Sequence, residues 1–394
     1  MLFNSYLFIL GFLPAALTGY FVCNRRFGSR AGQLWLFLSS CVFYGYASRP
    51  FLCLLLGSIG VNYLCMRLFF VLEKGSFSQR AALKKGLLLL GLSFDLGLLL
   101  YFKYTNFFIE NINAVCRTDF AERTILLPLG ISFYTFQQIS CLVDTYKGEA
   151  KAYTLLDYAC FVTFFPQLIA GPIVLHEELI PQFHDRQRKS FDPESFGRGV
   201  YAFSMGLAKK VLLADTLAPI VDMGINNLEY RGLVNIFLVM ACYVLQLYFD
   251  FSGYSDMALG IGQMFRLELP VNFDSPYKAS TMGEYWSRWH KTMTEFFTRY
   301  VYIPLGGSRK GLCRTLINTL FVFALSGFWH GANWTFFWWG VMNGVCICLH
   351  RLLVKRPERV PRMPGRIFVF IVEAVILWMF RETNVQEWLL VMRA

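Results

Sequence analysis

A long uncharged stretch in the last quarter of the chain constrains the fold most strongly. No Asp, Glu, Lys or Arg occurs from residue 316 to residue 349. One straight helix of that length would extend about 50 Å, whereas the hydrocarbon core of a bilayer is roughly 30 Å thick. Basic residues flank the stretch on both sides, at Arg309, Lys310, Arg314, Arg351 and Lys355. The sequence therefore predicts a membrane hairpin that turns near Gly331-Ala-Asn333, with His330 beside the turn.

The composition also favours a membrane protein. Hydrophobic residues make up 56% of the 394 residues, and the mean hydropathy is +0.44, which is more apolar than a soluble domain requires. The net charge of +11 does not indicate nucleic-acid binding, because basic residues form short clusters between apolar segments, such as Arg25-Arg26 and Lys84-Lys85. The eleven cysteines lie mostly in apolar runs, and we interpret them as small buried hydrophobic residues. We expect an all-α polytopic membrane protein, with residues 1–394 forming a single membrane-embedded domain.

The first three apolar segments predict the orientation of the chain. Residues Leu2 to Val22 carry no charge, lack a basic leader and are about as long as a membrane span, so they should remain as the first helix. The arginines that follow place its far end in the cytoplasm and the N-terminus outside. Residues 33–47 and 51–66 should enter and return, because the loop from Lys74 to Lys85 is again basic.

The next segments contain polar and helix-breaking residues. Residues 86–102 should cross outward and residues 126–143 should cross back. Asp95 within the first of these marks either a helix-packing contact or a polar pathway. Residues 155–174 have basic residues on both sides and contain Pro166 and Gly171-Pro172, which predicts a re-entrant element beside a cavity.

Three further regions are expected to be helical. Apolar segments cover residues 199–223 and 232–249, and the first contains Lys209-Lys210, which either lines an aqueous funnel or snorkels from a tilted helix. From Met282 to Tyr302, charged and aromatic residues alternate at spacings near three and four, which predicts one amphipathic helix at the membrane interface. A last apolar segment spans residues 367–380.

The five histidines include two candidates for chemistry. His330 lies between small residues in the uncharged stretch, and a neutral imidazole is well suited to accept a proton from a hydroxyl. The alternative is a hydrogen-bonded core histidine. His290 follows Trp286 and Arg288, a combination that could hold the phosphates and adenine of a nucleotide-bearing donor, although an ordinary interfacial helix would look similar. The other three histidines, His176, His184 and His350, are interpreted as structural.

Other sequence motifs exclude several classes of site. Asp250 and Asp256 lie six residues apart in an apolar region, and we interpret them as the polar wall of a funnel. Their spacing matches no metal-binding loop, so no metal is expected. The sequence contains no nucleophile elbow, Walker loop, dinucleotide-binding fingerprint or zinc cluster.

Five blocks together resemble the membrane-bound O-acyltransferase family. The similarity is to its bacterial branch of alginate O-acetyltransferase membrane subunits and to the related D-alanyl transferases of teichoic acid. The blocks are Pro128 to Gln137 running to Tyr146, Phe165 to Pro172, Tyr248 to Met257, Tyr285 to Gly307, and Gly327 to Ala332. Relatives of the alginate type continue through further membrane helices, so this chain is either a shorter branch or C-terminally short.

The resemblance implies a fold, a site and a reaction. The expected fold is a helical bundle with re-entrant and interfacial helices around a central tunnel. His330 would be the catalytic general base and His290 would assist it. Candidate residues for binding substrate or donor are Trp286, Arg288, Trp329, Asn333, Asp250, Asp256 and Gln137.

The resemblance also implies partners and a location. The donor would be a cytoplasmic thioester, either acetyl-coenzyme A or an acyl carrier protein, and no bound cofactor is expected. The acyl group, expected to be acetyl, would move across the bacterial inner membrane toward a secreted polysaccharide or an extracytoplasmic acyltransferase or export partner. D-alanyl transfer to teichoic acid and a non-enzymatic transporter or channel component are the alternatives.

Overall fold

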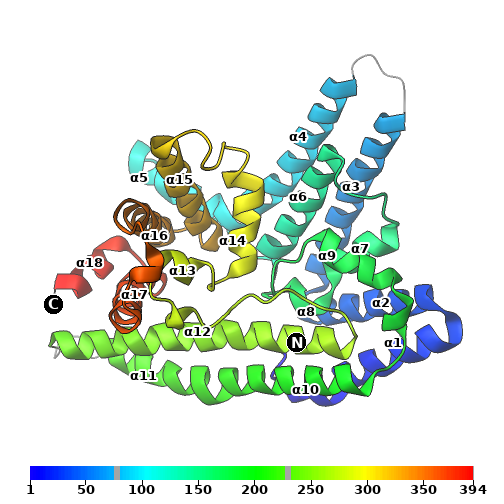
Figure 1. Ribbon diagram of the computed structural model, residues 1–394. Coiled ribbons are helices and arrows are strands. Elements are labelled where there is room, and N and C mark those ends of the chain that lie inside the picture. Colours follow the sequence, from blue (N-terminus) through cyan, green and yellow to red (C-terminus); the bar gives the residue numbers. More distant parts are fainter. Residues whose placement is uncertain (75–79, 227–231, 394) are drawn as a thin grey trace. The chain divides into compact units, whose positions relative to one another are not determined.

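The computed structural model describes residues 1–74, 80–226 and 232–393, and every regular element in these ranges is a helix (Figure 1). Seven of the described helices are long and apolar enough to cross a membrane. They are Leu7–Phe27, Arg49–Glu73, Arg80–Cys116, Val234–Met264, Leu312–His330, Trp334–Leu353 and Arg362–Phe380. Large apolar side chains on these helices are exposed, including Leu10 and Leu90, as lipid-facing residues would be. The prediction of an all-α polytopic membrane protein is confirmed.

The chain divides into two compact units. The N-terminal unit comprises Met1–Met205 and Asp256–Pro270, and the C-terminal unit comprises Gly206–Ser255 and Val271–Ala394. The helices α10 (Pro193–Ala208) and α12 (Leu233–Met264) each contribute residues to both. The prediction of a single domain over residues 1–394 stays a prediction.

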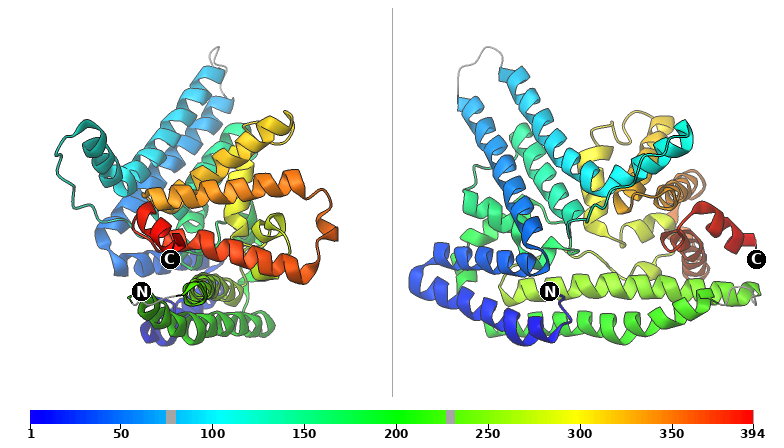
Figure 2. Two further views of the ribbon diagram at one scale, coloured as in Figure 1. Left: turned by 90° about the vertical axis from the view of Figure 1, so that its left-hand side faces the viewer. Right: turned by 180° about the vertical axis from the view of Figure 1, so that it is seen from behind.

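The N-terminal unit begins with a π-helical turn, Leu7–Phe12, that leads into α1 (Leu13–Phe27). Next come α2 (Ser29–Ala47), α3 (Arg49–Lys74) and α4 (Arg80–Leu99). Part of the predicted basic loop from Lys74 to Lys85, residues 75–79, lies outside the described residues. After a π-helical segment, Leu100–Tyr104, α5 (Thr105–Cys116) leaves α4 at a sharp angle (Figure 2).

The helix α6 (Ile131–Lys147) forms the centre of this unit. It begins five residues later than the predicted crossing at residue 126, and most of its side chains are buried. Gly130 precedes it with a φ of 71°, and a Cβ atom there would lie 2.4 Å from the carbonyl oxygen of Leu168, so only glycine fits. Asn62 of α3 donates to Asp95 of α4 at 2.7 Å and to Gln138 of α6 at 2.5 Å. These contacts support the helix-packing interpretation of Asp95.

The region predicted to be re-entrant is broken, as expected from its prolines and glycine. It forms α7 (Leu155–Thr163) and the single turn α8 (Phe165–Leu168), and nearly all of its residues are buried. The side chain of Thr154 caps α7, and Pro166 lies in the first turn of α8. A short helix, α9 (His176–His184), and a 3₁₀ turn, Arg186–Lys189, lead to α10.

In the C-terminal unit, the predicted end of one helix is wrong. The apolar segment expected at residues 232–249 continues as α12 to Met264. The sequence suggested an end because Asp250 interrupts the apolar run. Lys210 compensates this charge, since its Nζ lies 2.6 Å from Asp250 Oδ1 and 2.8 Å from Asp215 Oδ1. Lys210 belongs to the π-helical segment Lys209–Ala214, which is followed by α11 (Asp215–Asn226).

The predicted amphipathic helix from Met282 to Tyr302 is also wrong. The structure has two short helices, α13 (Met282–Trp286) and α14 (Lys291–Phe297), and a π-helical end, Thr298–Tyr302. The break falls at His290, whose φ of 43° is left-handed. The spacing of the aromatic residues was correctly recognised as helical, but periodicity alone does not reveal a single backbone reversal.

The predicted hairpin is confirmed. The helices α15 (Leu312–His330) and α16 (Trp334–Leu353) are joined at Gly331-Ala-Asn333, and Asn333 caps α16 by accepting from the backbone N–H of Thr335 at 3.0 Å. The last apolar segment forms α17 (Arg362–Leu377) and the 3₁₀ turn Trp378–Phe380, followed by α18 (Val385–Arg393).

Candidate active site

His330 is the last residue of α15 and lies at the hairpin turn of the C-terminal unit. Its ring is half-buried and contacts three aromatic rings, with centroid distances of 4.8 Å to Trp329, 5.0 Å to Trp339 and 5.2 Å to Phe380. The C-terminal end of a helix carries partial negative charge, which stabilises a nearby cation.

His290 lies in the break between α13 and α14 and is completely buried. Two backbone hydrogen bonds tie this break to the segment before the 3₁₀ turn η6 (Pro276–Lys278): Lys291 N–H donates to the carbonyl of Asn272 at 2.9 Å, and Asp274 N–H donates to the carbonyl of Arg288 at 2.9 Å. These bonds hold the left-handed conformation of His290, which costs about 1 to 3 kcal/mol and requires support from its surroundings.

The side chain of His290 packs against aromatic rings and has one polar partner. Its ring centroid lies 4.9 Å from Phe251 and 6.1 Å from Trp329. Its Nδ1 lies 3.1 Å from Oδ1 of Asn272. Burial lowers the pKa of His290 to about 3, so the ring is neutral at physiological pH.

The two imidazoles are neighbours, with ring centroids 6.2 Å apart. A ring nitrogen lies only about one bond length from the ring centre, so no direct hydrogen bond joins the two rings. The structure thus brings together two residues that are forty positions apart in the sequence, as the prediction of a paired role required.

Two predicted binding residues lie in the same aromatic cluster. Trp329 contacts both histidine rings. Trp286 is buried, and its ring lies 5.8 Å from Trp339, which in turn contacts His330.

Arg288 and Asn333 have clear structural roles. Arg288 forms ion pairs with Glu284 at 3.1 Å and Asp274 at 3.5 Å, so its charge is already compensated. Asn333 caps α16 and donates to the carbonyl of Thr383 at 2.7 Å. Their role in binding stays a prediction.

The remaining predicted residues lie elsewhere. Asp250 in the C-terminal unit is paired with Lys210. Gln137, which is buried in α6, and Asp256 both belong to the N-terminal unit. Among the described residues, no group of His, Cys, Asp and Glu could hold a metal ion.

A cavity of about 220 Å³ lies between α14, α15 and α16. Its wall is mostly apolar and includes Trp286, Phe323 and Ser326, which lies one helical turn before His330. Arg351 also lines it, donating to the hydroxyls of Tyr302 at 3.5 Å and Ser308 at 3.3 Å. Ligand pockets for drug-sized molecules usually exceed about 300 Å³, so this cavity suits a smaller group.

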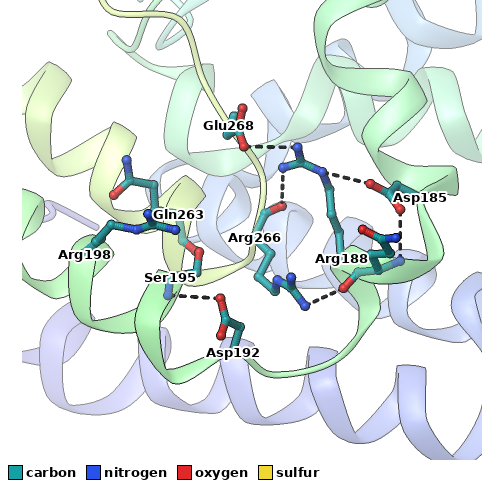
Figure 3. Close-up of a pocket in the computed structure, with 9 residues that line it drawn as sticks. Asp185, Arg188, Asp192, Ser195, Arg198, Gln263, Arg266 and Glu268 are labelled. Atoms are coloured by element: carbon teal, nitrogen blue, oxygen red, sulfur yellow. Dashed lines mark hydrogen bonds and ion pairs between the residues drawn. The ribbon is translucent and has the colours of Figure 1, made fainter.

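A second cavity, of about 370 Å³, lies in the N-terminal unit and is lined by charged residues (Figure 3). Arg188 is held there by Asp185 at 3.2 Å and Glu268 at 3.0 Å, and it also donates to the carbonyl of Arg266. Because these charges compensate one another, we assign the cluster a structural role: it anchors the segment around Arg186–Lys189.

Sequence reasoning missed several residues of the site. Asn272, Trp339 and Phe380 all contact the histidines, but they are separated from them in sequence and belong to no catalytic motif. His176, which was interpreted as structural, is buried between Asp144, at 3.1 Å, and Tyr153, at 2.8 Å. These contacts agree with a structural role.

A polytopic helical protein with two adjacent histidines inside its apolar core has the features of a membrane-embedded transferase. The family model of the membrane-bound O-acyltransferases matches residues 144–386, so the chain belongs to this family. It is 42% identical over 377 residues to a peptidoglycan O-acetyltransferase of Helicobacter pylori, covering 89% of this chain and 70% of that protein. It is 36% identical to a probable alginate O-acetylase of Pseudomonas aeruginosa, covering 98% of this chain and 73% of that protein.

A more distant relative is named for a different activity. A teichoic acid D-alanyltransferase of Streptococcus thermophilus is 25% identical over 249 residues, which covers 60% of each chain. All three relatives are named as enzymes that transfer acyl groups. The chain is therefore an acyltransferase, and the alternative of a non-enzymatic transporter no longer applies.

Proposed function

We propose that this protein transfers an acetyl group from a cytoplasmic thioester to a hydroxyl of a cell-envelope polysaccharide, either directly or through an extracytoplasmic partner. The observation that carries the proposal is the pair of imidazoles, 6.2 Å apart, inside an apolar core. The names of the relatives support O-acetylation, and peptidoglycan and alginate are the acceptor classes they suggest.

In the proposed reaction, His330 is the general base. A nitrogen of His330 takes the proton of the acceptor hydroxyl while its oxygen attacks the thioester carbonyl carbon. The carbon–sulfur bond then breaks, and the thiolate leaves with the proton returned by the imidazolium. The end of α15 stabilises that imidazolium. No nucleophilic serine is needed.

The role of His290 follows from its neutrality. A buried imidazole with a pKa of about 3 does not become the proton carrier near neutral pH, so it acts as a hydrogen-bonding group that positions the acceptor with its reacting hydroxyl toward His330. This division of roles gives His330 the proton transfer and His290 the positioning.

The 220 Å³ cavity, which reaches Ser326 one turn from His330 but is lined by neither histidine, is the proposed path of the donor arm toward the site. The Arg351 guanidinium on its wall suits the phosphate of a phosphopantetheine arm, which coenzyme A and acyl carrier proteins share. D-alanyl transfer is the second candidate, supported by the shorter match to teichoic acid enzymes. Competing acetyl and D-alanyl thioesters as donors would distinguish the two.

The location is part of the proposal. We place the protein in a bacterial inner membrane with its N-terminus outside, because Arg25, Arg26 and Arg30 follow the first span. An extracytoplasmic partner would then receive the acyl group or complete its transfer. A reporter fused to the N-terminus reads this orientation directly.

The proposal is tested by replacing His330 with Ala in cells. Mass spectrometry of the cell-envelope polysaccharides should show acetylation in the wild type and its loss in His330→Ala, at equal protein level and melting temperature. The matched control is His184→Ala, since His184 is exposed and lies in the N-terminal unit. Retained acetylation in His330→Ala would defeat the assignment.

A further inference from the structure

Asn272 is a buried residue that no sequence motif pointed to. It lies between α12 and the 3₁₀ turn Pro276–Lys278, with 1% of its surface exposed. Its backbone carbonyl accepts from Lys291 N–H, and its side-chain Oδ1 lies 3.1 Å from His290 Nδ1. Asn272 is thus bound to the His290 segment by both main chain and side chain.

The hydrogen bonds around Asn272 determine which nitrogen of His290 carries the proton. Oδ1 of Asn272 accepts from Oγ1 of Thr292 at 3.0 Å and from the backbone N–H of Thr292 at 3.4 Å. A backbone N–H can only donate, which identifies the side-chain atom facing it as the oxygen and not the amide nitrogen. The same oxygen can only accept from His290, so the proton of the neutral ring is on Nδ1 and the lone pair is on Nε2.

The Nε2 atom of His290 is buried, and within residues 1–74, 80–226 and 232–393 it has no hydrogen-bond partner. A buried acceptor without a donor is unfavourable, and such atoms are uncommon unless a ligand or water satisfies them. The neighbouring His330 lies too far away for a direct bond. A donor from the substrate, such as a hydroxyl, would satisfy Nε2.

We propose that Asn272, held by Thr292, is a positioning residue that fixes His290 in the Nδ1–H tautomer, so that Nε2 accepts a hydrogen bond from a second hydroxyl of the acceptor, next to the one that His330 deprotonates. The inference rests on the proposed roles of His330 and His290. It adds the group that sets the direction of this hydrogen bond, because in the other tautomer Nε2 would carry an N–H and could not accept.

The groups that face His290 are few. The segment before η6 contributes Asn272 and Phe273, α12 contributes Phe251, and α15 contributes Trp329 and His330. Of these, only His330 can gain a charge. A carboxylate placed at residue 272 would therefore change the protonation of His290 directly, because none of the other groups except His330 can carry a charge.

The decisive comparison uses two substitutions at residue 272. Asn272→Asp puts a carboxylate beside Nδ1, which favours the imidazolium and raises the pKa of His290. Because Nε2 is then protonated at low pH, the acid limb of the transfer rate should move to higher pH. Asn272→Leu removes the acceptor, frees the tautomer and should lower kcat about 10- to 100-fold, as when other orienting partners of histidine are removed.

Asn318→Leu is the matched control. Asn318 is another buried amide of the C-terminal unit, and it donates to the carbonyls of Gly307 and Leu305, away from the histidines. Its loss should lower stability but leave the pH profile of the remaining activity unchanged. A profile of Asn272→Asp that matches the wild type would overturn the inference.

Two further measurements separate this inference from the proposed function. In a His290→Asn background, Asn272→Leu should cost no additional activity, because both changes remove the same positioning. Independent losses that multiply would contradict the inference, even if His330→Ala is inactive. Nitrogen NMR of wild-type protein with labelled histidine reports the tautomer independently of any activity assay. His290 should be protonated at Nδ1, and protonation at Nε2 would overturn the inference.

Discussion

At the scale of residues, the two histidines have the same chemistry but different surroundings. His290 is fully buried among Phe251, Phe273 and Trp329 and is held neutral. His330 is half-buried at the C-terminal end of α15. In the proposed mechanism, this difference in environment, not residue type, distinguishes the proton carrier from the positioning group.

The neutral state of His290 predicts how stability depends on pH. The pKa is about 6.5 in the unfolded chain and about 3 in the folded one, so the unfolded state binds more protons between these values. The contribution of His290 to the free energy of unfolding is fully present above pH 6.5. It decreases as the pH falls below that value, by about 1.4 kcal/mol per pH unit. The melting temperature of the detergent-solubilised wild type should therefore fall from pH 7 to pH 5 more steeply than that of His290→Asn. Equal slopes in the two proteins would contradict the burial of a neutral ring.

At the scale of elements, the α15–α16 hairpin positions His330 through close backbone contact. A Cβ atom at Gly340 of α16 would lie 2.2 Å from the carbonyl oxygen of Phe323, and one at Gly327 of α15 would lie 2.2 Å from the carbonyl oxygen of Phe336. Neither backbone atom can rotate away. Small residues are the usual means of such close approach between membrane helices.

Gly340→Ala should therefore separate the two helices and shift His330. We expect a lower melting temperature, by several degrees, and a loss of transfer activity of at least about tenfold, since displacements near 1 Å are costly in catalysis. The control is Gly97→Ala in α4, where a Cβ atom would meet nothing within 4 Å. The melting temperature and the acyl-transfer activity of both variants are measured in parallel. If Gly340→Ala matches the wild type in both, the close contact is not required.

Elements formed by long apolar segments could be predicted from the sequence, whereas those set by tertiary contacts could not. The hairpin at Gly331 was predictable because the length of the uncharged stretch and the basic residues at both ends favour a turn over one tilted helix. The extension of α12 past Asp250 was not, because it depends on Lys210, forty residues earlier. The reversal at His290 was not either, since it is held by the backbone of Asn272.

The same distinction applies to the site. Both histidines and Trp329 were identified from motifs, and the structure brings them together. Asn272 was missed because its role exists only through a contact with a residue eighteen positions away. Arg288 was predicted to bind a donor, but the sequence could not show that Glu284 and Asp274 already pair with it.

At the scale of the whole molecule, membership in the membrane-bound O-acyltransferase family and the helical membrane architecture agree. The seven apolar helices explain the exposed hydrophobic surface, and the family match covers the segments that hold both histidines. The central claim is that an acyl thioester and a hydroxyl react between these two rings.

The most direct test follows the two substrates with purified protein in lipid vesicles. Acetyl-coenzyme A and an acetylated carrier protein are supplied separately as donors, with peptidoglycan fragments or alginate as acceptor. Wild-type protein should release free thiol from one donor and form an equal amount of acetyl ester, on the acceptor itself or on an extracytoplasmic partner supplied with it, and His330→Ala should do neither. Ester formation by His330→Ala at the wild-type rate would contradict the account.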